Sequence, residues 1–450
     1  MSVLNLGLAG VRAYIQPHLL PVGARVAWIG DSITQMNHQN GSATNSSLTT
    51  QQKGEIVTAQ MLDPRFRCDV WVAPDDHTTG RFMGGANHGV TGDTVSTPGP
   101  SYSPSGMLGR LNAEILPLRP DICIVAGGTN DISAINNLSG LQSICATLLS
   151  NGIKPVLCTI RPYGVGNVQS TTNQTAWTNL NAGIRAYAAA TPAVTLCDLA
   201  AAYGVPGAFA NVPANYFAVD GLHPSPFGAM FGAQAIQAAL AKLIQPGNWL
   251  LTTFWNAGTN LLTPTQATLS GGTTGGIAYT TKGQLATGYT CYANNTSSSI
   301  VSLVSNPQTT GQSQQFIVTP GGTAAAESFP FTLNMAVPAS ASNYVFALAE
   351  VEFDAWGYWG GASLAFNELP SSANQIARAN LGSAPFPNYP LAGRRWISTP
   401  PLKLDANATG VGAFQVSVVV CPNGASGSGT FKVHRMGIFP IPDPHIVWNS

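Results

Sequence analysis

The chain has 450 residues, only 8% of them charged, and its 19 Lys and Arg residues balance 19 Asp and Glu residues. This length predicts roughly two or three domains, and the absence of a basic excess argues against a nucleic-acid partner. No run of about 18 apolar residues occurs, so we expect no membrane partner. The sequence shows no cleavable secretory signal, and its uncharged polar residues favour an extracellular or virion-associated protein.

The first half of the chain alternates strand-like and helix-like segments. Short apolar runs rich in β-branched residues are typical of strands buried on both faces of a parallel sheet. These runs are 25–30, 68–73, 121–126, 154–160 and 193–198. The helix candidates are 51–61, 106–116, 138–150, 174–189 and 227–243. The alternation predicts an α/β sandwich with right-handed crossovers over residues 25–245.

The pattern changes near Pro246. Residues 249–450 lack a long helical period and instead show alternating apolar and polar positions, separated by turns rich in Gly, Ser, Thr and Pro. The clearest alternating runs are 344–353, 414–421 and 431–439. This pattern predicts an all-β sandwich or jelly-roll domain. Residues 1–24 form an N-terminal segment, which either packs against the α/β domain or binds a partner.

The cysteines predict no metal site and no disulfide framework. Their number is odd, and no two of them have the spacing of metal ligands. Several lie inside apolar runs, which favours buried, reduced thiols that pack as small hydrophobic side chains. The seven are Cys68, Cys123, Cys145, Cys158, Cys197, Cys291 and Cys421.

Four short polar segments follow predicted strands of the first half or precede one of its helices. They are Gly-Asp-Ser-Ile at 30–33, Gly-Val-Thr-Gly-Asp-Thr at 89–94, Gly-Gly-Thr-Asn-Asp at 127–131 and Asp-Gly-Leu-His at 220–223. Ligands of open α/β sheets bind at the carboxyl ends of the strands. Taken alone, the first segment favours an ordinary helix N-cap and the second an ordinary glycine turn.

Together the segments favour nucleophilic catalysis. One short turn can place Asp220 beside His223, so that the acid fixes the tautomer while the imidazole takes a proton from the Ser32 hydroxyl. The Asn130 amide would face the same sheet edge. Ester cleavage needs such a hydroxyl, such a base and donors for the developing oxyanion. The motifs of metalloproteases, nucleotide-binding loops and G-x-S-x-G hydrolases are absent, so we expect no cofactor and no metal.

In this order, the four segments resemble the signature blocks of the SGNH (GDSL) hydrolase family, over roughly residues 25–243. The resemblance implies a flavodoxin-like three-layer sandwich with a five-stranded parallel sheet and a serine esterase activity. It implies that Ser32 is the nucleophile, His223 the general base and Asp220 its orienting acid. It also implies an oxyanion hole made by the backbone N–H groups of Ser32 and Gly92 and the side-chain amide of Asn130.

The sequence departs from the family pattern in three places. Ile33 stands where Leu is commonest, and Thr91 stands where many relatives have Ser. Residues 35–52 form a long polar insertion directly after the nucleophile, so the shape of the pocket is not inherited from relatives. His88 either lines that pocket or makes a loop hydrogen bond, and the second is favoured.

The substrate is expected to be a small molecule or a glycan that carries a short acyl ester, with acetyl on a carbohydrate favoured. Residues 249–450 would then be an accessory domain that binds carbohydrate, through a platform at Trp356 and Trp359 if these side chains are not simply core. The alternatives are a phage-tail or receptor-binding protein with or without deacetylase activity, a lipase or acyltransferase on the same triad, and an idle pseudo-enzyme. An oligomer or a virion component is compatible with these readings.

Overall fold

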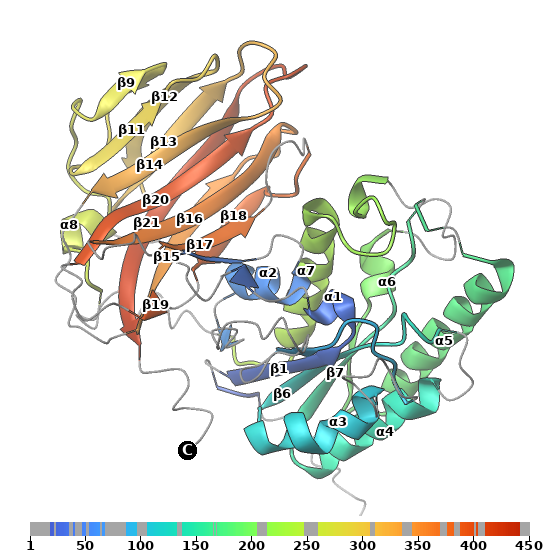
Figure 1. The fold of residues 1–450 in the computed structure, drawn as a ribbon. Helices are drawn as coiled ribbons and strands as arrows, with labels where there is room; N and C mark the ends of the chain where they lie inside the picture. The colour runs from blue at the N-terminus through green and yellow to red at the C-terminus, as the bar shows by residue number, and fades with distance from the viewer. Residues whose placement is uncertain are drawn as a thin grey trace, which may run out of the picture.

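An α/β body and a second body made mainly of strands lie side by side in the computed structural model of the chain (Figure 1). The residues that the structure describes are 19–21, 24–35, 39–40, 47–50, 54–63, 65–67, 87–96, 106–132, 137–164, 166–167, 169–204, 214–246, 260–306, 311–334, 344–369, 376–381, 388–399, 402–403 and 410–441. The predicted strand at 68–73 lies outside these ranges. The predicted domain boundary just after Pro246 lies at the end of the range 214–246.

The first body contains a parallel sheet with the order β4-β1-β6-β7-β8, and β5 pairs with β1 beside β4. Its strands are β1 (Ala24–Gly30), β4 (Phe66–Arg67), β5 (Asn87–Gly89), β6 (Ile122–Ala126), β7 (Lys154–Cys158) and β8 (Thr195–Cys197). The apolar runs predicted at 25–30, 121–126, 154–160 and 193–198 are therefore confirmed as parallel strands.

Helices cover both faces of this sheet. The helices of this body are α1 (Ser32–Gln35), α2 (Glu55–Leu62), α3 (Gly106–Glu114), α4 (Asn137–Ser150), α5 (Thr171–Ala190), α6 (Leu199–Ala202) and α7 (Pro226–Leu240), with 3-10 turns at Leu116–Leu118 and Ala214–Tyr216. Successive residues of β6 alternate between two cores: Ile122 and Ile124 pack with α2 and α7, whereas Cys123 and Val125 pack with α3, α4 and α5. This alternation follows from the period of two in a strand, and it confirms the three-layer α/β fold.

The second body is a sandwich of two sheets. One has the order β10-β12-β13-β21-β15-β18, with β19 beside β15. The other begins with two strands from the first half of the chain, β2 (Gln39–Asn40) and β3 (Ser47–Thr50), and has the order β2-β3-β17-β16-β20-β14-β11-β9. The elements after residue 260 are α8 (Pro264–Ala267), β9 (Ile277–Tyr279), β10 (Thr281–Gly283), β11 (Tyr289–Ala293), β12 (Ser298–Ser305), β13 (Gln312–Thr319), β14 (Glu327–Asn334), β15 (Tyr344–Phe353), β16 (Trp359–Leu369), β17 (Ile376–Leu381), β18 (Gly393–Ser398), β19 (Leu402–Lys403), β20 (Gly410–Val420) and β21 (Gly429–Ile441).

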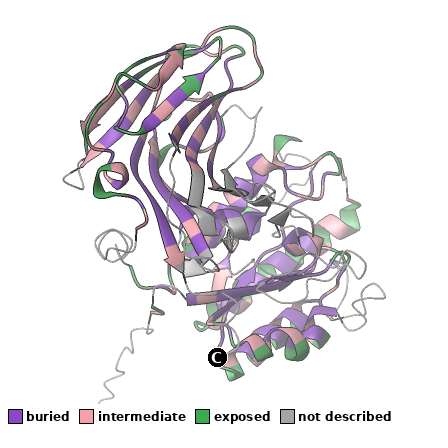
Figure 2. Ribbon diagram, turned by 60° about the vertical axis from the view of Figure 1, so that its left-hand side comes forward, coloured by how far each residue is buried: buried purple, intermediate pink, exposed green. Residues whose placement is uncertain are grey.

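Aromatic side chains fill the space between the two sheets. The rings of Phe316 and Phe431 stack with centroids 4.3 Å apart, and Phe316 also contacts Phe331 of the opposite sheet. Burial alternates along the strands, as Figure 2 shows. Trp359 is 1% exposed, so it belongs to this core and not to a surface platform. The predicted β-sandwich is confirmed.

Two strands of the sandwich come from the first half of the chain. β2 (Gln39–Asn40) and β3 (Ser47–Thr50) form an antiparallel pair, and β3 pairs in parallel with β17. These strands lie within the polar insertion at 35–52, directly after Ser32. α2 follows and packs against β18, so α2 and α7 lie between the two bodies (Figure 1). The insertion therefore connects the turn that contains Ser32 to the sheet of the sandwich that contains β17.

The described cysteines are buried and form no disulfide: Cys123, Cys145, Cys158, Cys197, Cys291 and Cys421. This agrees with the prediction of reduced thiols that pack in the core, while Cys68 lies outside the described residues. Burial raises the pKa of the Cys291 thiol to about 11, so this thiol is not activated as a nucleophile. Among the helices in the described ranges, none has the length and hydropathy to cross a membrane.

Candidate active site

Ser32 lies at the carboxyl end of β1, where the strand turns sharply into α1. A side chain at Gly30 would meet the Thr34 hydroxyl at 2.0 Å and the Ala126 carbonyl oxygen at 2.2 Å, so only glycine fits there. Asp31 Oδ1 accepts a hydrogen bond from the Ile33 N–H at 3.0 Å. These contacts fix the turn and leave Ser32 half-buried at the edge of the sheet.

The carboxylate next to Ser32 is fully buried. Asp31 is 1% exposed, and its burial raises its pKa, although the charge of Arg161 and the Ile33 hydrogen bond oppose this effect. A buried carboxyl group with a raised pKa beside a candidate nucleophile is the kind of perturbation that gathers at functional sites.

Strand register brings three of the predicted residues to one edge. Gly30 of β1 pairs with Gly89 of β5 on one side and with Ala126 of β6 on the other. Ser32 follows this row by two residues, while Gly92 and Asn130 follow it by three and four. All three strands are parallel, so these residues leave the sheet in the same direction.

The loop after β5 forms a tight turn around Gly92. The Asp93 N–H donates to the Val90 carbonyl oxygen at 3.0 Å, and Gly92 has a φ of 74°, which favours glycine. Asn130 Nδ2 donates to the Asp93 carbonyl oxygen at 2.7 Å. A primary amide has two N–H donors, so one of them holds the loop and the second is left for a ligand.

His223 links Ser32 to Asp220. Its Nε2 lies 3.0 Å from Ser32 Oγ, and its Nδ1 lies 2.6 Å from Asp220 Oδ2. Both distances are within hydrogen-bonding range. With a proton on Nδ1, the ring donates to Asp220 and accepts from the Ser32 hydroxyl. This arrangement can take a proton from Ser32 when the oxygen attacks an electrophile.

The turn at 220–223 holds the acid and the imidazole in place. Asp220 Oδ1 accepts hydrogen bonds from the Leu222 and His223 N–H groups at 2.9 and 3.0 Å. Gly221 has a φ of 62°, and a side chain there would lie 2.4 Å from the Asn167 nitrogen. Partial burial acts to raise the pKa of Asp220, but the hydrogen bonds from His223 and Leu222 outweigh it and lower the pKa. Asp220 therefore stays ionised beside the imidazole.

The structure also places the other residues that the sequence singled out. His88 is a buried residue of β5, and its Nδ1 lies 3.3 Å from Glu114 Oε2 of α3, so its hydrogen bond joins a strand to a helix and not two parts of a loop. Within the described ranges, no group of three or more His, Cys, Asp or Glu side chains could hold a metal ion.

Sequence reasoning missed the buried ion pair between Asp93 and Arg110, which lies directly behind Gly92. Arg110 Nη2 is 2.6 Å from Asp93 Oδ2. A signal for it exists in the sequence, because Arg110 shares the buried face of α3 with Met107 and Leu111. A charged residue at a core position of a helix indicates a buried partner.

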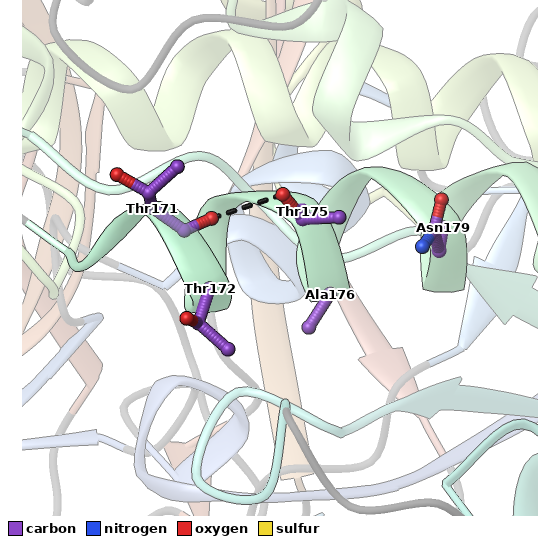
Figure 3. A pocket seen from close by; sticks show the side chains of 5 residues that line it. All are labelled: Thr171, Thr172, Thr175, Ala176 and Asn179. Carbon is purple, nitrogen blue, oxygen red and sulfur yellow. Dashed lines mark hydrogen bonds between the residues drawn. The ribbon is translucent and has the colours of Figure 1, made fainter.

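A separate hollow lies on the surface of α5 (Figure 3). Its volume is about 440 Å³, and it is lined by Thr171, Thr172, Thr175, Ala176 and Asn179. The Thr175 hydroxyl donates to the Thr171 carbonyl oxygen at 3.0 Å, within the same helix. All lining residues come from one helix, and none belongs to the site around Ser32.

Comparison with known proteins gives one family and several solved structures. Residues 28–230 match the model of the GDSL-like lipase/acylhydrolase family. No curated protein matches the chain. A lipolytic protein of the G-D-S-L family from Desulfitobacterium hafniense is 16% identical, with a TM-score of 0.33, and the match covers 48% of this chain and 99% of that one.

Two further structures are similar over about half of the chain. The acetyl xylan esterase AlAXEase is 18% identical with a TM-score of 0.33, and the match covers 48% of this chain and 98% of that one. The carbohydrate acetylesterase Est24 from Sinorhizobium meliloti is 15% identical with a TM-score of 0.34, and the match covers 49% of this chain and 100% of that one.

Proposed function

We propose that residues 28–230, which match the model of the GDSL-like lipase/acylhydrolase family, form a carboxylic ester hydrolase that acts through an acyl-Ser32 intermediate. The observation that carries the proposal is the continuous hydrogen-bonded path from Ser32 Oγ through His223 to Asp220, at 3.0 and 2.6 Å. Such a path supplies the activated hydroxyl that ester cleavage requires.

In the first half-reaction, Ser32 Oγ bonds to the ester carbonyl carbon while its proton moves to His223 Nε2. The carbonyl oxygen gains the negative charge. When the tetrahedral species collapses, the bond to the alcohol oxygen breaks, and His223 returns the proton to the departing alcohol. Asp220 stabilises the imidazolium that exists between these two proton transfers. The result is an ester between the acyl group and Ser32.

In the second half-reaction, water attacks the acyl carbon while His223 takes its proton. When the tetrahedral species collapses, the bond between the acyl carbon and Ser32 Oγ breaks, His223 returns the proton to Ser32 Oγ, and the carboxylic acid leaves. The N–H groups of Ser32 and Gly92 and the free amide hydrogen of Asn130 are the proposed donors to the oxyanion in both halves. Removing one such donor typically costs about 100- to 1000-fold in kcat.

We propose further that the substrate is a short acyl ester, with acetyl on a neutral carbohydrate favoured. Only 8% of the residues are charged, so the molecular surface suits an uncharged, hydroxyl-rich partner. The outer face of strands β11, β14 and β20 is also uncharged. Its partly exposed side chains include Thr290, Tyr292, Thr332, Gln415 and Ser417.

The test is the initial rate of hydrolysis of p-nitrophenyl esters from acetyl to decanoyl, with Ser32→Ala as the inactive variant and Ser313→Ala as a matched serine control. We expect activity confined to acetyl and propionyl esters, lost in Ser32→Ala and kept in Ser313→Ala. Acetate release from acetylated polysaccharides then tests the alcohol. Rates that peak at long chains would replace the acetyl proposal with a lipase, and undiminished activity in Ser32→Ala would overturn the mechanism.

A further inference from the structure

The buried guanidinium group of Arg110 binds the two ends of the loop that contains Gly92. Arg110 of α3 donates from Nε and Nη2 to Asp93 Oδ2, at 3.1 and 2.6 Å. Its Nη1 and Nη2 also donate to the His88 carbonyl oxygen, both at 3.2 Å. Because His88 precedes the turn and Asp93 follows Gly92, Arg110 binds both ends of the loop.

This contact lies in the interior of the protein. Arg110 is 3% exposed and Asp93 is 0% exposed, and Glu114 Oε2 accepts a further hydrogen bond from Arg110 Nη1 at 2.6 Å. A buried ion pair is tolerated only when its geometry is good and its remaining donors are satisfied. The planar guanidinium provides that geometry with donors at fixed angles, which the single ammonium group of lysine does not.

Through Asp93, the contact with Arg110 reaches two of the proposed oxyanion donors, the Gly92 N–H and the Asn130 amide. Its N–H donates to the Val90 carbonyl oxygen and closes the turn in which Gly92 has its φ of 74°. Its own carbonyl oxygen accepts the hydrogen bond from Asn130 Nδ2. A displacement of Asp93 would therefore move the Gly92 N–H and the Asn130 amide together.

We propose that Arg110 is a positioning residue for the oxyanion hole, and this inference rests on the function proposed above. Arg110 contacts no reacting atom and acts through Asp93. Oxyanion donors must meet the oxygen where it lies in the transition state, and they contribute much less to binding of the ground-state ester. Loss of the contacts that Arg110 makes with Asp93 and His88 should therefore lower kcat and leave KM almost unchanged.

The first test compares Arg110→Lys with wild type on p-nitrophenyl acetate. Lysine keeps a positive charge near Asp93 but lacks the planar guanidinium that binds Asp93 and His88 together. We therefore expect kcat to fall about 10- to 100-fold, with KM changed by less than about threefold. The affinity for a boronic acid, which forms a tetrahedral adduct with Ser32, should fall in parallel with kcat. Arg185→Lys is the matched control, because Arg185 makes a similar two-bond contact with Asp198, at 2.7 and 2.8 Å, away from the site.

A second variant removes both charges. Arg110→Met combined with Asp93→Asn leaves no unpaired charge at the Arg110–Asp93 contact, and Glu114 keeps its contact with His88, so the variant should fold and should show the same loss of kcat as Arg110→Lys. A kcat within twofold of wild type in either folded variant would overturn the inference. A fall in kcat with a matching rise in KM and unchanged boronic acid affinity would overturn it as well.

Asn130→Ala separates a failure of this inference from a failure of the proposed function. If Asn130→Ala loses kcat but the Arg110 variants do not, the oxyanion hole stands and the positioning role is wrong. If Asn130→Ala keeps wild-type kcat, the proposed oxyanion hole fails, and the role of Arg110 fails with it.

Discussion

Within the residues that the structure describes, two serine–histidine–carboxylate arrangements occur, one in each body. At the edge of the parallel sheet, Ser32 Oγ is 3.0 Å from His223 Nε2, and His223 Nδ1 is 2.6 Å from Asp220 Oδ2. In the sandwich, Ser313 Oγ is 2.7 Å from His434 Nδ1, and His434 Nε2 is 2.9 Å from Glu352 Oε2. Measured by distances alone, the second is as well formed as the first.

The difference lies in what surrounds the two serines. Ser32 is half-buried at a strand end, at the sheet edge where Gly92 and Asn130 also follow their strands. Ser313 lies inside β13 and is 0% exposed, and His434 is 1% exposed. Under the proposed function a substrate meets the partly exposed Ser32, whereas burial closes Ser313 to any substrate. The comparison shows that a hydrogen-bonded relay becomes a candidate catalytic site only with access and with donors for the oxyanion.

The sandwich arrangement instead satisfies a buried imidazole. Burial and the nearby charge of Arg394 lower the pKa of His434, and they outweigh the hydrogen bond with Glu352, which acts to raise it. A neutral ring with its proton on Nε2 donates to Glu352 and accepts from the Ser313 hydroxyl. Both ring nitrogens are then paired, as buried polar groups generally are, so the arrangement serves stability.

Replacing each histidine with glutamine, in two separate variants, should give the largest difference between the two arrangements. His223→Gln removes the base and should lower kcat about 10⁴- to 10⁶-fold. His434→Gln should leave kcat within about twofold and lower only the free energy of unfolding, since it disturbs a buried network. Initial rates on p-nitrophenyl acetate and urea denaturation of both variants measure this. Substantial activity in His223→Gln would remove the proposed base, and a large loss of kcat in folded His434→Gln would tie the sandwich to the chemistry.

The sequence alone predicts the first arrangement because its parts are encoded locally. Short apolar runs mark β1 and β6, and the glycines and polar residues that follow them mark the strand ends. Parallel strands then bring these ends to one edge of the sheet by a general rule. The separation of Asp220 and His223 by a single turn is also visible in the sequence. These features need no knowledge of which distant strands pair.

The second arrangement depends on pairing between strands that are far apart in the sequence. Glu352 and Lys432 are cross-strand partners in β15 and β21, and a register irregularity after Glu350 shifts His434 beside them. The pairing of β3 with β17 has the same character, because nothing in the polar insertion indicates a partner more than 300 residues away. Alternating polarity in β15 and β21 predicts strands with one buried face, but it does not predict register.

Acidification provides a smaller effect that is specific to the sandwich. The pKa of His434 in the folded protein lies below its ordinary value of 6.5, so folding favours the neutral ring. The stability that this provides is complete above pH 6.5 and is lost as the pH falls through the lowered pKa. The free energy of unfolding of the wild type should therefore drop between pH 7.5 and 5.5, and it should drop less in His434→Gln. Equal slopes in the two proteins would show that another group causes the pH dependence.

The smallest expected effect comes from Ser313→Ala. This change leaves His434 Nδ1 without the hydroxyl that donates to it, in a site closed to water, and an unsatisfied buried acceptor costs about 1–3 kcal/mol. Urea denaturation should show that loss, while kcat stays at the wild-type value. Ser32→Ala should give the opposite result, with full stability and no turnover, since the Ser32 hydroxyl lies at an accessible edge where water can replace it. If Ser313→Ala were as stable as wild type, the two serines would differ only in access, and the sandwich network would contribute no measurable stability.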